Sequence, residues 1–195
     1  GQRVYEQAQH LHNDSIRWSP DSSVLVVGDS YGRITFHELQ TGRVTELKPA
    51  SPNEYGVSSM AWSPAGDRLA AFYWHQSNSS KVRIFNVQTM QPLREIPVAT
   101  GPRNVDWSAD GRWLAFADQE QVRIHETQNY TLERTIPQPE VSWLQFSPDS
   151  TQLLCTSRDE PGTTAYDTRT WVPVAADTTL VVSGEVGVHS KWLSD

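Results

Sequence analysis

The feature that most constrains this chain is a motif that recurs about every 44 residues. Four segments share an apolar residue, an aromatic anchor two positions later, and a turn of the Ser-Pro-Asp type directly after the anchor. The anchors are Trp18, Trp62, Trp107 and Phe146, which lie 44, 45 and 39 residues apart. A fifth anchor is predicted at Trp192, 46 residues after the fourth. A repeat of this length indicates that similar units stack side by side.

Each repeat has the pattern of short strands. Residues around the anchor alternate between apolar and polar, which is the period of a β-strand. The turn after the anchor reverses the chain, because proline presets φ and Asp or Gly tolerates the next positions. An apolar run follows, such as 69–72, and then a further strand, such as 82–85. A Gln-Thr-Gly type of turn leads to a shorter fourth strand. No ten-residue segment has helical spacing, so the sequence predicts an all-β protein.

Four short strands in about 40–45 residues are typical of a β-propeller blade. A single blade cannot bury both of its faces, whereas stacked blades cover one another and leave only short edges exposed. A β-sandwich is the alternative, but its strands do not repeat a turn motif at this period. We therefore expect an all-β β-propeller of four four-stranded blades plus partial strands of another. The expected repeats are approximately 12–47, 56–97, 102–136 and 140–174, with the start of a fifth at 186–195.

The length of 195 residues corresponds to four blades and a fraction at this period. We therefore expect a single partial propeller domain, a segment of a larger ring of about seven or eight blades. The open ends of such a segment would be covered by the rest of the chain or by another subunit.

The blade motifs resemble those of the WD-repeat family, whose units contain Trp-Ser-Pro-Asp-Gly, a later Leu-Ala pair, and a Trp-Asp dipeptide. Here that dipeptide is replaced by Phe36-His37, Phe85-Asn86, His125-Glu126 and Tyr166-Asp167. TolB-like propellers and those of prolyl peptidases are similar, and 114–116 (Leu-Ala-Phe) fits them equally well. The resemblance implies a non-catalytic scaffold for protein–protein interaction. The alternative is a propeller module of a larger enzyme or transport assembly, such as a peptidase gate or a TolB-like periplasmic module.

Composition and charge exclude several classes. A hydrophobic share of 37% with a net charge of only −7 is unlike a disordered chain. No apolar run approaches the eighteen residues of a transmembrane helix, and a single cysteine, Cys155, excludes an internal disulfide. The cationic residues are spaced singly in a chain of acidic net charge, so we expect neither a nucleic acid nor a membrane as partner. The expected compartment is the cytoplasm, with a periplasmic or secreted location as the alternative.

No motif indicates catalysis. The chain has no Gly-x-Ser-x-Gly elbow, no His-Glu-x-x-His, no P-loop and no Gly-x-Gly-x-x-Gly, and its six histidines are scattered. We therefore predict no catalytic, cofactor or metal residues, and no enzyme activity within these residues.

The candidate binding residues follow from the way a propeller exposes its connections. Connections after the first and third strands are uniform among the repeats, whereas those after the second and fourth strands vary in length and content. Variable loops on a rigid scaffold are where recognition concentrates, and Trp and Tyr dominate binding hot spots. The predicted partner-binding residues for a protein or peptide are Tyr55, Tyr73, Trp74, His75, Trp143 and Arg158. For Trp74 and Trp143, packing between blades is the alternative.

Overall fold

A computed structural model describes residues 16–48, 56–75, 80–98, 104–157, 162–175, 180–181 and 191–192. All regular structure in these residues is β-strand, and each of the four repeats forms one antiparallel sheet whose strands are ordered as in the sequence. The prediction of an all-β propeller is confirmed. The strands pair in sequence order because a tight turn after each short strand brings the next strand alongside it.

Blade 1 consists of β1 (Ile16–Trp18), β2 (Val24–Gly28), β3 (Ile34–Glu38) and β4 (Val44–Leu47). Blade 2 consists of β5 (Val57–Trp62), β6 (Arg68–Tyr73), β7 (Ser80–Asn86) and β8 (Gln91–Val98). Blade 3 consists of β9 (Val105–Trp107), β10 (Trp113–Ala117), β11 (Gln121–Glu126) and β12 (Thr131–Pro137). Blade 4 consists of β13 (Val141–Phe146), β14 (Gln152–Ser157), β15 (Thr163–Asp167) and β16 (Pro173–Val174).

A separate two-stranded sheet follows blade 4. It pairs β17 (Leu180–Val181) with β18 (Lys191–Trp192). The sequence predicts Trp192 in the first strand of a fifth blade; in the structure its strand pairs with β17, which precedes it in the chain. That β18 opens a blade stays a prediction.

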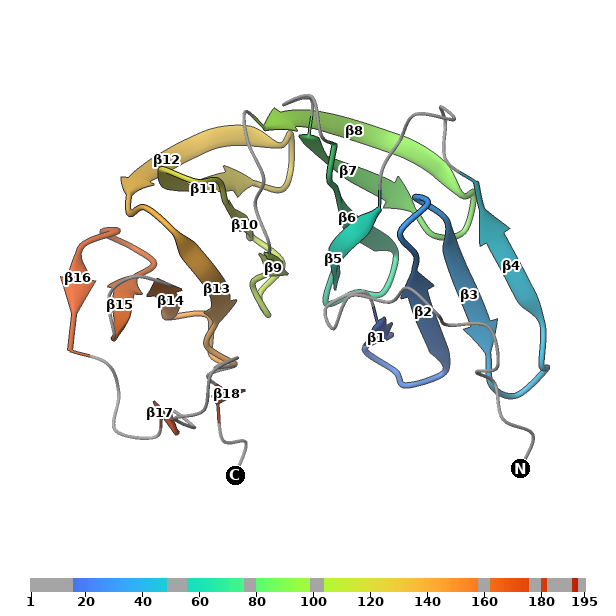
Figure 1. Cartoon of the computed structure of the whole chain (residues 1–195). Coiled ribbons are helices and arrows are strands. Elements are labelled where there is room, and N and C mark those ends of the chain that lie inside the picture. Colours follow the sequence, from blue (N-terminus) through green and yellow to red (C-terminus); the bar gives the residue numbers. More distant parts are fainter. Residues whose placement is uncertain are drawn as a thin grey trace.

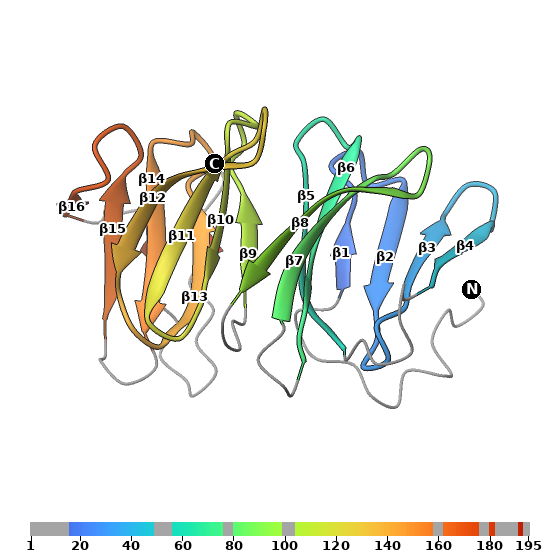
Figure 2. The same cartoon turned by 90° about the horizontal axis from the view of Figure 1, so that it is seen from above.

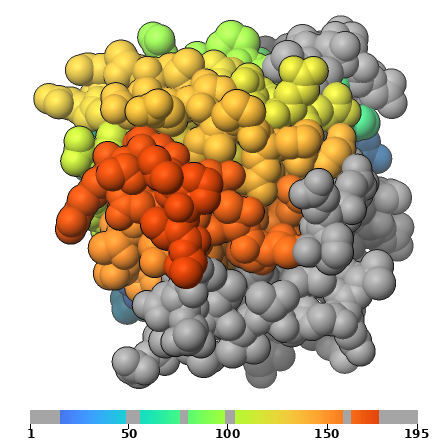
Figure 3. Space-filling model, turned by 90° about the vertical axis from the view of Figure 1, so that its left-hand side faces the viewer, coloured from blue at the N-terminus to red at the C-terminus, as the bar shows by residue number. Residues whose placement is uncertain are grey.

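The blades are arranged as an arc, with the first strand of each blade on the inside and the fourth on the outside (Figure 1). The strands run between two faces (Figure 2). The turn face carries the connections after first and third strands, and the loop face carries those after second and fourth strands. On the outer side of blade 4, β15 and β16 reach the molecular surface (Figure 3).

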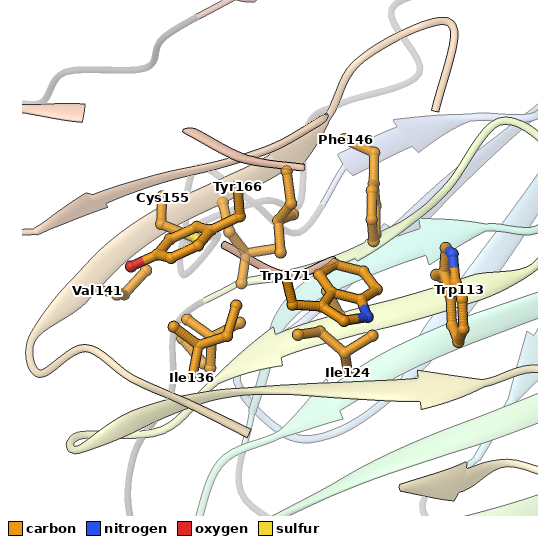
Figure 4. Close-up of a cluster of buried hydrophobic side chains, with 13 residues drawn as sticks. Trp113, Ile124, Ile136, Val141, Phe146, Cys155, Tyr166 and Trp171 are labelled. Atoms are coloured by element: carbon orange, nitrogen blue, oxygen red, sulfur yellow. The ribbon is translucent and has the colours of Figure 1, made fainter. Parts of the chain in front are cut away.

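Neighbouring blades bury apolar side chains between them. We call the side of each blade that meets the next blade its forward face, and the opposite side its back face. The forward face of blade 3 and the back face of blade 4 share one cluster, which includes Trp113, Ile124, Phe146, Tyr166 and Trp171 (Figure 4). Similar clusters join blades 2 and 3 and blades 1 and 2. Each large apolar side chain buried in this way contributes about 1.5–3 kcal/mol.

The turn after each anchor is held by its serine. In blade 3, the Ser108 hydroxyl donates to Asp110 at 2.6 Å and accepts the Trp113 N–H at 2.8 Å. The same two bonds occur at Ser19, Ser63 and Ser147. This side-chain bracket adds to the backbone bond between the same two residues, so the serine sets the start of every second strand, with its aspartate two residues later in blades 1, 3 and 4 and four residues later in blade 2.

The outer turn of each blade, between its third and fourth strands, needs a left-handed residue. That residue is Gly42 in blade 1, with φ of 69°, but Met90, Tyr130 and Trp171 in the others, with φ of 56–57°. A left-handed conformation is unfavourable for bulky residues. Tertiary packing compensates for it, because Trp171 packs edge-on against Trp113 of blade 3, with ring centroids 5.4 Å apart.

Candidate interaction surface

The loop face of blade 1 is shaped by one aspartate. Asp29 Oδ1 accepts the N–H groups of Tyr31 at 2.8 Å and Arg33 at 3.0 Å, while Oδ2 accepts from Arg33 Nε at 2.7 Å. The hydrogen bond and charge of Asp29 raise the pKa of the Arg33 guanidinium. The tight loop projects Tyr31 outward, and 63% of its surface is exposed.

Gly56 joins the loop of blade 2 that carries Trp74 to the loop of blade 1 that carries Tyr31. The Gly56 N–H donates to the Ser30 carbonyl at 3.0 Å, and the Gly56 carbonyl accepts the Trp74 N–H at 3.1 Å. A Cβ at Gly56 would lie 3.2 Å from the Ser30 Cα, so the close approach of the two backbones favours glycine. Trp74 is 40% exposed. Two exposed aromatic residues therefore stand on neighbouring, mutually bonded loops.

Two of the predicted residues lie on the described loop face. Trp74 is exposed there, and the partly buried His75 donates its main-chain N–H to the Ser80 hydroxyl at 3.2 Å. Tyr55 and Arg158 lie outside the described residues. Whether this set binds a partner stays a prediction.

Two other predicted residues are buried, which corrects their expected placement. Tyr73 is 2% exposed, because β6 extends to this residue and turns its side chain inward against Phe85, with Arg83 over its ring at 5.1 Å. Trp143 is 8% exposed and packs with Leu154 and Ala165 of the same blade. Neither side chain is presented to a partner on the loop face.

Tyr31 was not among the predicted residues. The segment around it is a short connection between a second and a third strand with the Asp-x-x-Gly pattern of a tight turn, and it lacks the long insertion that marked the other candidate loops. The available signal was the aromatic residue inside that short connection.

The described connections on the loop face of blades 3 and 4 are polar. Asp118 accepts the N–H groups of Glu120 and Gln121 at 3.1 Å, and Gln138 accepts from the Tyr166 hydroxyl at 3.0 Å. In the connections of this face that the structure describes, the exposed large apolar side chains are Tyr31 and Trp74. The aromatic surface therefore belongs to blades 1 and 2.

The described residues contain no group of three or more His, Cys, Asp or Glu side chains able to hold a metal ion. Burial raises the pKa of the Cys155 thiol, which therefore remains protonated. Across the described ranges, no helix is long and apolar enough to cross a membrane. The arrangement on the loop face can recognise a partner by aromatic contact and hydrogen bonding.

The stacked four-stranded sheets define the class as part of a β-propeller, and the resemblance to WD-repeat proteins stated from the motifs is confirmed as a resemblance. The chain is similar to "Ribosome biogenesis protein WDR12 homolog" from Dictyostelium discoideum, with 26% identity over an alignment of 152 residues. The match covers 74% of this chain and 32% of that protein. No protein-family model matches the chain.

Solved structures share the fold. A chain of the mitotic checkpoint complex matches with a TM-score of 0.75 and 19% identity, over 88% of this chain and 54% of that one. Kuenenia stuttgartiensis hydrazine synthase matches with a TM-score of 0.69 and 22% identity, over 88% of this chain and 51% of that one. Dihydro-heme d1 dehydrogenase NirN matches with a TM-score of 0.71 and 17% identity, over 88% of this chain and 38% of that one. The chain thus spans about a third of its curated relative and about half or less of these solved chains.

Proposed function

We propose that this chain is a non-catalytic platform that binds a protein or peptide through its loop face, with Tyr31 and Trp74 as the central contacts. The observation that carries the proposal is the pair of exposed aromatic side chains on loops tied together by Gly56. Tyr and Trp bury large areas at low conformational cost, and a rigid scaffold has little entropy to lose on binding.

Two comparisons support a protein partner. The curated relative is named as a ribosome biogenesis protein, and one solved structure of the same fold is part of a checkpoint complex. Both names describe proteins that act in assemblies. The proposal keeps the cytoplasm as the compartment expected from the sequence.

The alternative is a propeller module inside a larger enzyme or transport assembly. Its support is the fold shared with hydrazine synthase and NirN, which are enzymes by name. These similarities lie below 25% identity and concern the fold alone. In this alternative the reacting groups would come from outside these residues.

A defined peptide probe tests the proposal. A displayed peptide library is selected on the immobilised chain, and the recovered peptide is titrated calorimetrically against the wild type and against Tyr31→Ala and Trp74→Ala. Loss of a central aromatic contact costs at least about 2 kcal/mol, so each variant should weaken the Kd by about 30-fold.

The matched controls are Leu39→Ala and Leu132→Ala, which remove exposed apolar side chains away from the loop face. Both should bind the peptide like the wild type. If the two aromatic variants bind as tightly as the controls, or if the Leu39 variant alone loses binding, the assignment to the loop face is wrong.

A further inference from the structure

Blade 2 neutralises a buried arginine with a carboxylate on its outer strand. Arg83 of β7 lies on the back face of blade 2, and its Nε donates to the carboxylate of Glu95 in β8 at 2.7 Å. The two residues pair directly across the sheet. The ammonium of Lys81 lies 3.6 Å from the same carboxylate. Two cations thus share one carboxylate at this position of the blade.

Arg123 occupies the same position in blade 3 without that carboxylate. It lies on the back face of blade 3, and its Nη1 donates to the Pro97 carbonyl of blade 2 at 2.8 Å. Its partner directly across the sheet is Thr135, where blade 2 has Glu95. A threonine carries no charge, so the position that neutralises Arg83 in blade 2 is neutral beside Arg123.

A second arginine lies at the same junction. Arg94 is exposed on β8 and pairs with Ile84, which belongs to the apolar cluster between blades 2 and 3. Burial lowers the pKa of the His125 imidazole in blade 3, and the charges of Arg123 and Arg94 lower it further. Both guanidinium groups therefore act on one point at the outer side of this junction.

Within the part of the chain that the structure describes, neither Arg94 nor Arg123 pairs with a carboxylate. The shortage is local, because the chain has 23 acidic and only 16 basic side chains, and Arg33 finds a partner in Asp29. Two neighbouring guanidinium groups repel each other unless an anion lies between them, and arginine is well shaped to bind a carboxylate. This junction therefore favours an anion from outside the described residues.

The surface around the two arginines indicates that the anion belongs to a protein. The outer strands β8 and β12 follow one another along the outer side of the arc (Figure 1). Leu93, directly before Arg94, is an exposed apolar residue of β8, and Leu132, which pairs with His125, is an exposed apolar residue of β12. Exposed leucines beside a cationic site match a peptide in which acidic and apolar residues are neighbours.

We propose that the outer side of the junction between blades 2 and 3 binds an acidic segment of a protein partner, with Arg94 and Arg123 as its cationic contacts. A carboxylate of the partner takes the position beside Arg123 that the Glu95 carboxylate takes beside Arg83. Blade 2 supplies the precedent, because two cations share one carboxylate there. The Thr135 hydroxyl is a further donor for the bound carboxylate. This surface is separate from the loop face, so the inference does not depend on the proposed function.

Calorimetric titration at low salt tests this site. The probes are a synthetic peptide containing Leu-Glu-Glu-Leu and the same peptide with Gln in place of each Glu. The wild type should bind the acidic peptide and not the Gln peptide, and Arg123→Gln should weaken the Kd by about tenfold or more, because a charge-assisted hydrogen bond is lost. Arg134→Gln is the matched control. It removes the same charge from an exposed arginine of β12 that pairs with Ile124 on the forward face, so its Kd should stay within about twofold of the wild type.

A second variant supplies the missing carboxylate from within the chain. Thr135→Glu should raise the midpoint of urea unfolding and abolish binding of the acidic peptide, because Arg123 then has the partner that Arg83 has.

Three results would overturn the proposal. The first is a wild type that does not distinguish the acidic peptide from the Gln peptide. The second is equal weakening by Arg123→Gln and Arg134→Gln, which would mean that net charge alone attracts the peptide. The third is a folded Thr135→Glu variant that binds like the wild type. The loop-face peptide is titrated separately against the Tyr31 and Trp74 variants, so failure here leaves the proposed function standing.

Discussion

Asp106 lies in β9 of blade 3 and its Oδ2 accepts the main-chain N–H of Phe146 in blade 4 at 2.7 Å. Its ionisation makes the stability of this junction depend on pH. Burial raises the pKa of its carboxyl from 3.8 to about 7, although the N–H groups of Phe146 and Trp107 and the charge of Arg17 act in the opposite direction. The perturbation is Asp106→Asn, which keeps an oxygen that accepts the Phe146 N–H and removes the ionisation.

The magnitude follows from the difference between the folded and unfolded pKa values. Because the folded pKa is raised, the contribution to stability is fully present below pH 3.8 and is lost as the pH rises through about 7. The loss is about 1.4 kcal/mol per pH unit and reaches about 4 kcal/mol above pH 7. The asparagine side chain does not ionise, so the variant does not lose this stability as the pH rises. Its free energy of unfolding should therefore exceed that of the wild type by an amount that grows from near zero at low pH to about 4 kcal/mol above pH 7.

Urea unfolding followed by tryptophan fluorescence measures this difference between pH 4 and pH 8. Subtracting the two curves cancels the titration of other groups, including His125, whose pKa is lowered by burial. A difference that stays constant across this range, or that shrinks as the pH rises, would refute the assigned burial of Asp106.

Three further changes test the turns and junctions by urea unfolding. Ser22→Gly relieves a φ of 58° at an exposed position and should stabilise the chain by about 0.5–1 kcal/mol; a lower unfolding midpoint would contradict this. Trp171→Gly relieves similar strain but removes the contact with Trp113, so it should destabilise by about 2–4 kcal/mol, and a neutral result would show that strain dominates. Tyr130→Phe keeps the ring and loses the bond to Arg68, which should cost about 1 kcal/mol; no change would mean that this bond is not formed in solution.

Much of the fold could be predicted because its signals are local. The bracket of serine and aspartate sets the start of each second strand within a few residues, and alternation defines the strands on either side. The repeat period then specifies stacked four-stranded units, and the sequence order of the strands separates the turn face from the loop face.

The candidate site was predicted only in part, because exposure depends on where a strand ends and what covers it. Trp74 lies just beyond β6 and is exposed, whereas Tyr73 is the last residue of that strand and is buried. In blade 4, β13 begins early enough to place Trp143 inside the sheet, after an irregular register between Val141 and Trp143. A single residue of strand length separates Tyr73 from Trp74, and an irregular register sets the place of Trp143; propensity resolves neither difference.

The sequence by itself therefore determined the repeat, the strand order and the two faces of the arc, since turn chemistry and alternation act over a few residues. Only the tertiary structure decided which residues meet across the junctions, such as Arg68 and Tyr130, which are 62 residues apart. It also decided that Tyr130 and Trp171 occupy left-handed positions expected for glycine. Packing against a neighbouring blade offsets that local cost, and no local pattern encodes the position of the neighbour.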